Sequence, residues 1–214
     1  MKQVFFLLFP ICFSAASVGC ADPFDSALRA SEEGHHGKAA AAFHTLARDG
    51  DGVAAYNLAL LFATGRGVPQ NDREARYWAW RARLADVSAA SRILTRLWPP
   101  DDVSQRKEIA DRLEADLQPL VAAGDGAAML QLAAVLLVVR ENPDVISGHS
   151  WQSIAAALDV PGAVSARDAT LESLHGADRA KAQEQALATF RTWCMEQHPL
   201  PPACGIMAAS GPNS

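Results

Sequence analysis

The feature that most constrains the fold is an internal repeat, which emerges when the chain is compared with itself at an offset of 74 residues. Segment 46–69 aligns without gaps with segment 120–143, and nine of the 24 aligned positions are identical. The identical pairs are Leu46/Leu120, Gly50/Gly124, Asp51/Asp125, Gly52/Gly126, Ala54/Ala128, Leu58/Leu132, Ala59/Ala133, Arg66/Arg140 and Pro69/Pro143. After the prolines the offset falls to 73, which aligns Trp78 with Trp151 and Asp86-Val87 with Asp159-Val160. Half of this spacing, about 37 residues, is typical of one helix-turn-helix unit of an α-solenoid.

The first copy carries clear signals for the start and end of a helix. Asp51 suits an N-cap, and apolar residues at positions 54, 58 and 61 share one face of a helix that we expect to end near residue 64. Gly65 and Gly67 accept the left-handed conformation of a helix C-terminus, and Pro69 blocks continuation of the helix. These three residues are therefore predicted to form a structural turn.

A second helix follows the turn, capped by Asn71 or Asp72 and running to about residue 84. The stretch LARDGDGVAAYNLALLFATGRGVPQND, which starts at Leu46, resembles the Sel1-like repeat, a relative of the tetratricopeptide repeat. The resemblance includes an A-x-x-G-D-x-x-A-like opening, a G-x-G-V-P turn, an acidic cap and the A-x-x-W pattern that ends at Trp78. It implies an all-α solenoid of about four helix pairs, wound as a right-handed superhelix, of the exported bacterial type.

The resemblance divides the chain into three parts. Residues 22–197 are expected to form the solenoid, with an opening half-repeat at about 24–49 and clear repeats at about 38–85 and 112–158. Degenerate helix pairs are predicted at 86–98 with 104–123 and at 161–174 with 177–197, and in the second clear repeat the sequence VRENP replaces the glycine turn. Residues 198–214 are rich in Pro and Gly and are expected to form a flexible tail unless a disulfide holds them.

Residues 1–21 have the pattern of a signal peptide. Lys2 precedes an apolar run of about ten residues, which is too short to span a bilayer, and small residues lead to a cleavage site after Ala21. An N-terminal membrane anchor is the alternative that this short run disfavours. A second alternative is lipidation, because Ser17-Val18-Gly19-Cys20 resembles a bacterial lipoprotein box. We therefore expect a periplasmic or secreted protein, with membrane attachment only if Cys20 is lipidated.

Cysteine usage agrees with export. Cys12 and Cys20 lie in or beside the signal segment, which leaves Cys194 and Cys204 as a pair in the rest of the chain. An even pair in an oxidising compartment is a disulfide candidate, and closing its loop of about ten residues would stabilise the fold by roughly 2–3 kcal/mol. The alternative is two unpaired thiols.

The sequence offers little that indicates catalysis, metal binding or nucleic-acid binding. The net charge is −5, whereas a nucleic-acid binder carries a patch or stripe of basic residues. The six histidines lack ligand spacing, and we expect solvated helix-end residues and no metal or cofactor. Ser104 and Lys107 fit the S-x-x-K pattern of serine acyl-enzymes, which makes a penicillin-binding or β-lactamase-like hydrolase the alternative function. No S-D-N or K-T-G motif accompanies them, and helix capping explains Ser104, so we predict no catalytic residues.

The remaining functional class is a non-enzymatic scaffold that binds a protein or peptide partner, which is also the role that the family resemblance implies. Asn57 and Gln131 occupy equivalent positions in the two copies and are polar, so they are candidates to face a binding groove. Trp80 lies roughly 140° from the inward stripe of its helix and is a third candidate for a contact surface. Packing of Trp80 beneath the long middle helix is the alternative.

Overall fold

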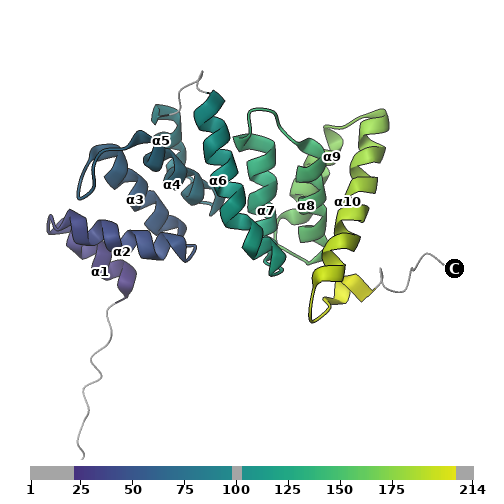
Figure 1. Cartoon of the computed structure of the whole chain (residues 1–214), viewed down its shortest axis with the longest axis horizontal. Coiled ribbons are helices and arrows are strands. Elements are labelled where there is room, and N and C mark those ends of the chain that lie inside the picture. Colours follow the sequence, from purple (N-terminus) through teal and green to yellow (C-terminus); the bar gives the residue numbers. More distant parts are fainter. Residues whose placement is uncertain (1–21, 98–102, 206–214) are drawn as a thin grey trace, which may run out of the picture.

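The computed structural model describes residues 22–97 and 103–205, and regular structure in this part of the chain is helical. Figure 1 shows the helices stacked side by side from α1 at one end to α10 at the other, which confirms the all-α solenoid. The elements are α1 (Pro23–Glu32), α2 (His36–Arg48), α3 (Gly52–Thr64), α4 (Asp72–Leu84), α5 (Ala90–Leu97), α6 (Val103–Ala122), α7 (Gly126–Ala134), the π-helical turn η1 (Val135–Val139), α8 (Val145–Ala157), α9 (Ala163–Glu172), α10 (Gly176–Glu196) and the 3₁₀ turn η2 (Pro202–Cys204). The handedness of the superhelix stays a prediction.

The helix starts lie where the capping signals of the sequence predict them. The carboxylate of Asp51 accepts hydrogen bonds from the backbone N–H groups of residues 53 and 54, at 2.8 and 2.9 Å, and opens α3. Asn71 caps α4 in the same way, and Asp125 accepts from the N–H of residue 128 at 3.0 Å to open α7. These side chains satisfy N–H groups that the first turn of a helix leaves without partners.

The turn between α3 and α4 is repeated between η1 and α8 without its glycines. In the first copy, the N–H of Arg66 donates to the carbonyl of residue 61, and that of Asn71 donates to the carbonyl of residue 62. In the second copy, the N–H groups of Arg140 and Asp144 donate to the equivalent carbonyls of residues 135 and 136. The five-residue π turn η1 replaces the left-handed Gly65, so the loop keeps its hydrogen bonds although it is one residue shorter.

The similarity between the two copies continues into the turns that follow α4 and α8. Asp86 and Asp159, at equivalent positions after α4 and α8, adopt left-handed φ values of 62° and 56°. Gly50 and Gly124 take this conformation before α3 and α7. Each copy of the repeat therefore contains two left-handed turns, one before its first helix and one after its second helix. Asp is among the few non-glycine residues that tolerate this region.

A close backbone approach explains why one glycine pair is shared between the copies. A Cβ on Gly52 would lie 2.6 Å from the Cβ of Ala85 and 3.1 Å from a methyl of Val87. A Cβ on Gly126 would lie 2.2 Å from a methyl of Val160, the residue equivalent to Val87. In both units the start of one helix is therefore packed directly against the turn that follows the next helix.

Helix packing differs from the predicted pairing in two places. The short α5 packs on α4, and α10 packs mainly on α8, whereas the sequence suggested that 86–98 would pair with 104–123 and 161–174 with 177–197. The opening segment 24–49 contains two helices, α1 and α2, because Gly34 breaks it at a φ of 80°. The short helices α5 and α9 thus each pack on the helix that precedes them in the chain, α4 and α8 respectively.

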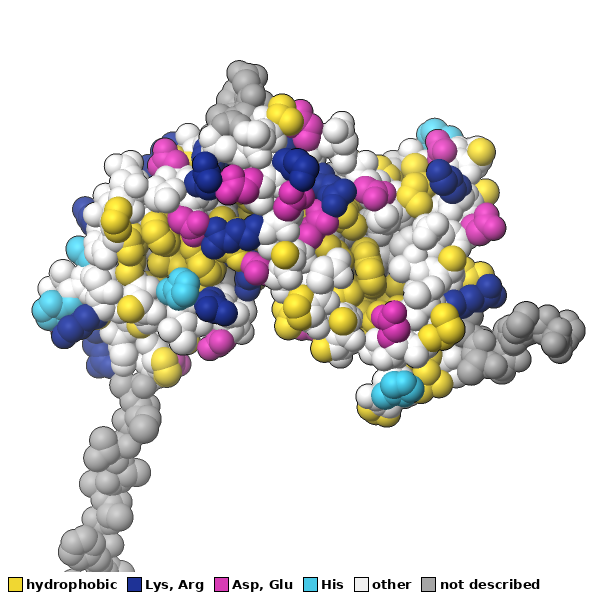
Figure 2. Space-filling view, in the orientation of Figure 1, with side chains coloured by type: hydrophobic (Ala, Val, Ile, Leu, Met, Phe, Trp, Pro, Cys, Tyr) yellow, Lys and Arg dark blue, Asp and Glu magenta, His cyan; other side chains and the backbone are white. Residues whose placement is uncertain are grey.

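A network of polar side chains joins α4 to α6. The Tyr77 hydroxyl donates to the Asp116 carboxylate, which also pairs with Arg81 at 3.1 Å. Arg112 lies 3.5 Å above the centre of the Tyr77 ring and pairs with Glu74 at 2.6 Å. Figure 2 shows basic and acidic side chains gathered over α6, where this network lies. Tyr77 is buried, and its pKa is raised by burial and by the Asp116 carboxylate.

The end of α10 is held against the end of α6. The indole N–H of Trp193 donates to the carbonyl of Val121 at 3.1 Å, and the amide of Gln197 donates to the carbonyl of Ala122 at 3.2 Å. A disulfide joins Cys194 to Cys204, which is 1% exposed. The predicted tail is thus anchored as far as residue 205. Residues 206–214 and the predicted signal segment 1–21, with Cys20, lie outside the described residues.

Candidate binding site

A recess of about 760 Å³ lies between the first and second halves of the solenoid, and we name it the central recess. The end of α4 with the turn after it, α5, the start of α6, the exposed side of α7 and η1, and the turn before α9 form its walls. Its lining residues are Trp80, Arg83, Leu84, Ala85, Asp86, Ser91, Leu94, Thr95, Arg106, Ala127, Leu130, Gln131, Ala134, Val138, Val160 and Pro161.

Part of the side of α7 and η1 is open at the recess. Leu130, Gln131 and Ala134 of α7 border it together with Val138 of the π turn, which is 62% exposed. π-Helical turns inside helices are frequent at functional sites.

The chemistry of the central recess suits a peptide better than a polar metabolite. Leu84, Leu94, Leu130 and Val138 supply most of an apolar floor, and the amide of Gln131 can both donate and accept hydrogen bonds. Arg83, Arg106 and Asp86 add two positive charges and one negative charge at the border. Such a surface can bury apolar side chains while polar groups fix their orientation.

The structure brings together two of the three residues that the sequence singled out for binding. Trp80 and Gln131 border the same recess, from α4 and α7 respectively. Asn57 does not border it, and its amide donates to the carbonyl of Val53 on its own helix at 2.9 Å. Although Asn57 and Gln131 are equivalent in the repeat, only Gln131 borders the central recess.

The predicted turn residues have structural positions. Gly65 ends α3 in a left-handed conformation, and a Cβ on Gly67 would lie 2.3 Å from the backbone of His36. Gly67 therefore allows the turn to contact the start of α2. Pro69 lies in the same connection, before the cap of α4.

The Ser104 and Lys107 pair lies at the start of α6, and neither residue borders the central recess. The Lys107 ammonium is 74% exposed and pairs with Asp111 at 2.5 Å. Within 22–97 and 103–205, no cluster of three His, Cys, Asp or Glu side chains is arranged to hold a metal ion.

One functional candidate was missed, because His149 was expected to be a solvated helix-end residue and that prediction is wrong. His149 lies inside α8 and is 2% exposed. A usable signal existed in the repeat: at the offset of 73, His149 aligns with Arg76, two residues before the matched tryptophans Trp78 and Trp151. Arg76 is also buried, and it hydrogen bonds to the carbonyl of Leu97 at 2.6 Å.

No family model matches the chain, and the comparison with curated proteins gave no match. Among solved structures, the chain is similar to one described as a protective antigen present in uropathogenic Escherichia coli strains, displaying an SLR fold. The sequence identity is 18% and the TM-score is 0.38, with 83% of this chain and 44% of that chain covered. The chain therefore spans less than half the length of that protein. None of the helices that the structure describes has the length and apolar character that crossing a bilayer requires.

Proposed function

We propose that this protein is a non-enzymatic scaffold that holds a segment of a partner protein in the central recess. The observation that carries the proposal is the uncovered side of α7 and η1, where Val138 is 62% exposed beside Trp80 and Gln131. Monomeric proteins rarely leave contiguous apolar surface open without a use, and aromatic anchors are enriched in protein interfaces. The solenoid supplies the rigidity that keeps both walls of the recess in place.

The border of the recess favours a partner segment that combines apolar side chains with an acidic residue. Arg83 is exposed at the border of the recess, in a chain whose net charge is −5. Apolar side chains of the segment would cover the floor, and its carboxylate would lie near Arg83. Charge complementarity of this kind increases association rates and selects among partners.

We place this activity in the bacterial cell envelope. The pattern of residues 1–21 and the Cys194–Cys204 disulfide support export, because disulfides persist in oxidising compartments. Attachment to a membrane would require lipidation of Cys20.

The test is retention of a partner from an envelope extract by the purified chain and by two matched variants. Val138→Glu places a carboxylate in the central recess, whereas Val53→Glu makes the same change at a 47% exposed position on α3, outside the recess. The unmodified chain and Val53→Glu should retain the same protein, and Val138→Glu should bind it at least tenfold more weakly in a titration of the purified partner. Equal binding by all three chains would exclude the central recess as the site.

A further inference from the structure

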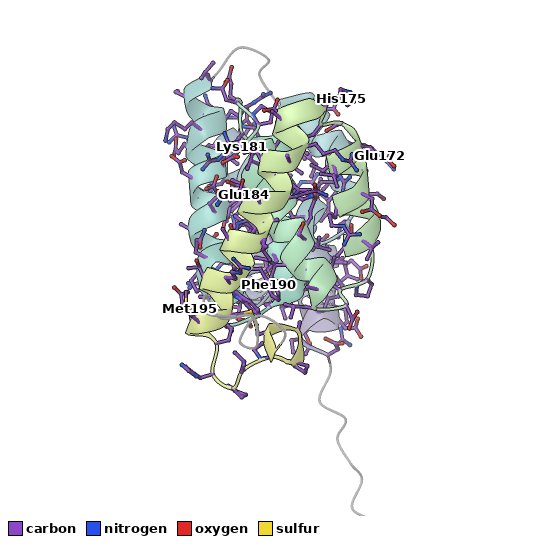
Figure 3. The ribbon with its side chains drawn as sticks, turned by 90° about the vertical axis from the view of Figure 1, so that its right-hand side faces the viewer. Glu172, His175, Lys181, Glu184, Phe190 and Met195 are labelled. Carbon is purple, nitrogen blue, oxygen red and sulfur yellow. A yellow bond between two sulfur atoms is a disulfide. The ribbon has the colours of Figure 1, made fainter. Side chains whose placement is uncertain are left out.

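Most of the described chain consists of two equivalent four-helix units, α3–α6 and α7–α10. The helices α4, α5 and α6 begin at residues 72, 90 and 103, and α8, α9 and α10 begin at residues 145, 163 and 176, so each start is displaced by 73 residues. Figure 3 shows the last helix of the second unit, α10, which runs down the near side of the molecule with Lys181 and Glu184 above Phe190. Comparison of the two units therefore relates differences in sequence to differences in packing.

Each unit has a recess beside its third helix. The central recess, of about 760 Å³, lies beside α5, and a recess of about 370 Å³ lies between α8, α9 and α10. Arg167 borders the smaller recess at the position equivalent to Leu94, which borders the central recess. The same relation holds between Asp168 and Thr95. The two recesses are thus related by the repeat, and the one in the second unit has about half the volume.

The fourth helix approaches the second helix more closely in the second unit than in the first. α10 packs closely on α8, whereas α6 makes a looser contact with α4 and packs mainly on α7 and η1. The buried residues Ala182 and Ala186 of α10 stand at the positions of Ile109 and Leu113 in α6. The separation of packed helices varies from about 8 to 10 Å with the size of the side chains at the contact. Small side chains therefore let α10 come close to α8.

Two large side chains are stacked between α4 and α6. Arg112 of α6 lies 3.5 Å above the centre of the Tyr77 ring of α4, and Tyr77 is 3% exposed. The Tyr77 hydroxyl donates to the Asp116 carboxylate, and Arg112 pairs with Glu74 at 2.6 Å. These bonds fix both side chains of the stack, which we name the Tyr77–Arg112 pair.

The second unit lacks the equivalent of the Tyr77–Arg112 pair. The corresponding positions of α8 and α10 hold Ser150 and Gln185. Ser150 is 1% exposed, and its hydroxyl donates to the carbonyl of Ile146 on its own helix at 2.9 Å. Because this hydrogen bond is made within α8, the short side chain needs no partner from α10 and leaves room for close packing.

The spacing of α4 and α6 affects the central recess through the helices that form its walls. α4 contributes Trp80 and Leu84 to one side of the recess, and α7 contributes Leu130 and Gln131 to another. α6 is the helix that packs on both α4 and α7. A movement of α6 toward α4 would therefore bring α7 with it and narrow the recess.

We propose that Tyr77 and Arg112 are positioning residues that hold α6 away from α4 and thereby keep the central recess wide enough for the partner segment. The larger recess and the Tyr77–Arg112 pair occur in the same unit, and the smaller recess occurs where both large side chains are replaced. The role in partner binding rests on the function proposed above, whereas the effect on helix spacing does not.

The first experiment measures the helix spacing in the full chain without any partner. Spin labels carried by non-natural amino acids at the exposed positions 72 on α4 and 115 on α6 report the distance by pulsed electron spin resonance. The double variant Tyr77→Ser/Arg112→Gln introduces the side chains of the second unit, and the distance should shorten by about 2 Å. An unchanged distance in this variant would overturn the proposal.

Control variants separate the positioning role from a loss of stability. Tyr77→Phe keeps the ring and should keep the distance, and Tyr56→Ser, which removes the same side chain from α3, should also leave it unchanged. Circular dichroism shows whether each chain is folded. If the double variant is unfolded, Tyr77→Leu/Arg112→Gln takes its place, because leucine is smaller than tyrosine and keeps an apolar side chain in the core; the same shortening is expected, and an unchanged distance again overturns the proposal.

The second experiment titrates the partner that the unmodified chain retains from the envelope extract. The double variant should bind this purified protein at least tenfold more weakly, and Tyr77→Phe should bind it with the affinity of the unmodified chain. A shortened distance with unchanged affinity would refute the role in binding. If the unmodified chain retains no protein, the role in binding fails together with the proposed function, and the distances alone then uphold or overturn the role in spacing.

Discussion

Replacement of Gly126 by Ala tests the close approach that the repeat preserves. The new Cβ would lie 2.2 Å from a methyl of Val160, so that side chain or the helix start must move by about 1.3 Å to restore ordinary contact. Overpacking of this kind costs about 1–3 kcal/mol, and better helix propensity returns at most about 0.5–1 kcal/mol. We expect the free energy of unfolding to fall by about 1–2 kcal/mol and Tm to fall by about 2–8 °C.

The same substitution in a Val160→Ala background should be nearly neutral, because the nearest remaining atom of residue 160 is its Cβ, 3.6 Å away. Urea unfolding of the four chains of this double-mutant cycle gives the coupling energy directly. The equivalent cycle with Gly52→Ala and Val87→Ala is the matched control, and it should show much less rescue because the Cβ of Ala85 remains 2.6 Å away. An equal loss of stability on Gly126→Ala in both backgrounds would refute the close approach to Val160 as the cause.

Three further predictions concern the disulfide and two buried rings. Replacing Cys194 and Cys204 together by Ala should lower the free energy of unfolding by about 2–3 kcal/mol in urea, and a reductant should then have no further effect. Tyr77 should ionise at a higher pH than an ordinary tyrosine in an ultraviolet titration, and the stability it contributes should be lost as the pH rises through its raised pKa; Tyr77→Phe should remove this late transition. Because the pKa of His149 is lowered on folding, its contribution to stability should be complete above pH 6.5 and lost as the pH falls, and His149→Gln should flatten this dependence in unfolding measurements from pH 7.5 to 5.

The sequence predicted those parts of the fold that depend on local signals. Asp51, Asn71 and Asp125 are helix caps because their short polar side chains reach the N–H groups of the next turn, and this interaction is visible in the sequence. The packing of α10 on α8 was not visible, because it depends on contacts between segments that are distant in the sequence. Local patterns place the helices but do not specify which pairs pack together.

For the candidate site residues too, local signals could be read from the sequence, whereas contacts between distant segments could not. Trp80 was identified because its angle on a helix is fixed by helical geometry, and Gln131 because it repeats a polar position. Asn57 satisfied the same criterion but lies outside the central recess, because equivalent positions in the two copies have different neighbours in the folded chain. His149 was missed because a histidine in the middle of a helix does not reveal which side faces the core.

The bonds from Trp193 and Gln197 to the end of α6 have a mechanical consequence. Helices stacked so that each touches only its neighbours detach one at a time when one end is pulled. A force applied at residue 205 would instead be shared by α6, α8 and α10, because α10 packs on α8 and its end is bonded to the last carbonyls of α6. A force applied at residue 22 would meet mainly the packing of α1 on α2, so the solenoid should resist extension far better from one end than from the other.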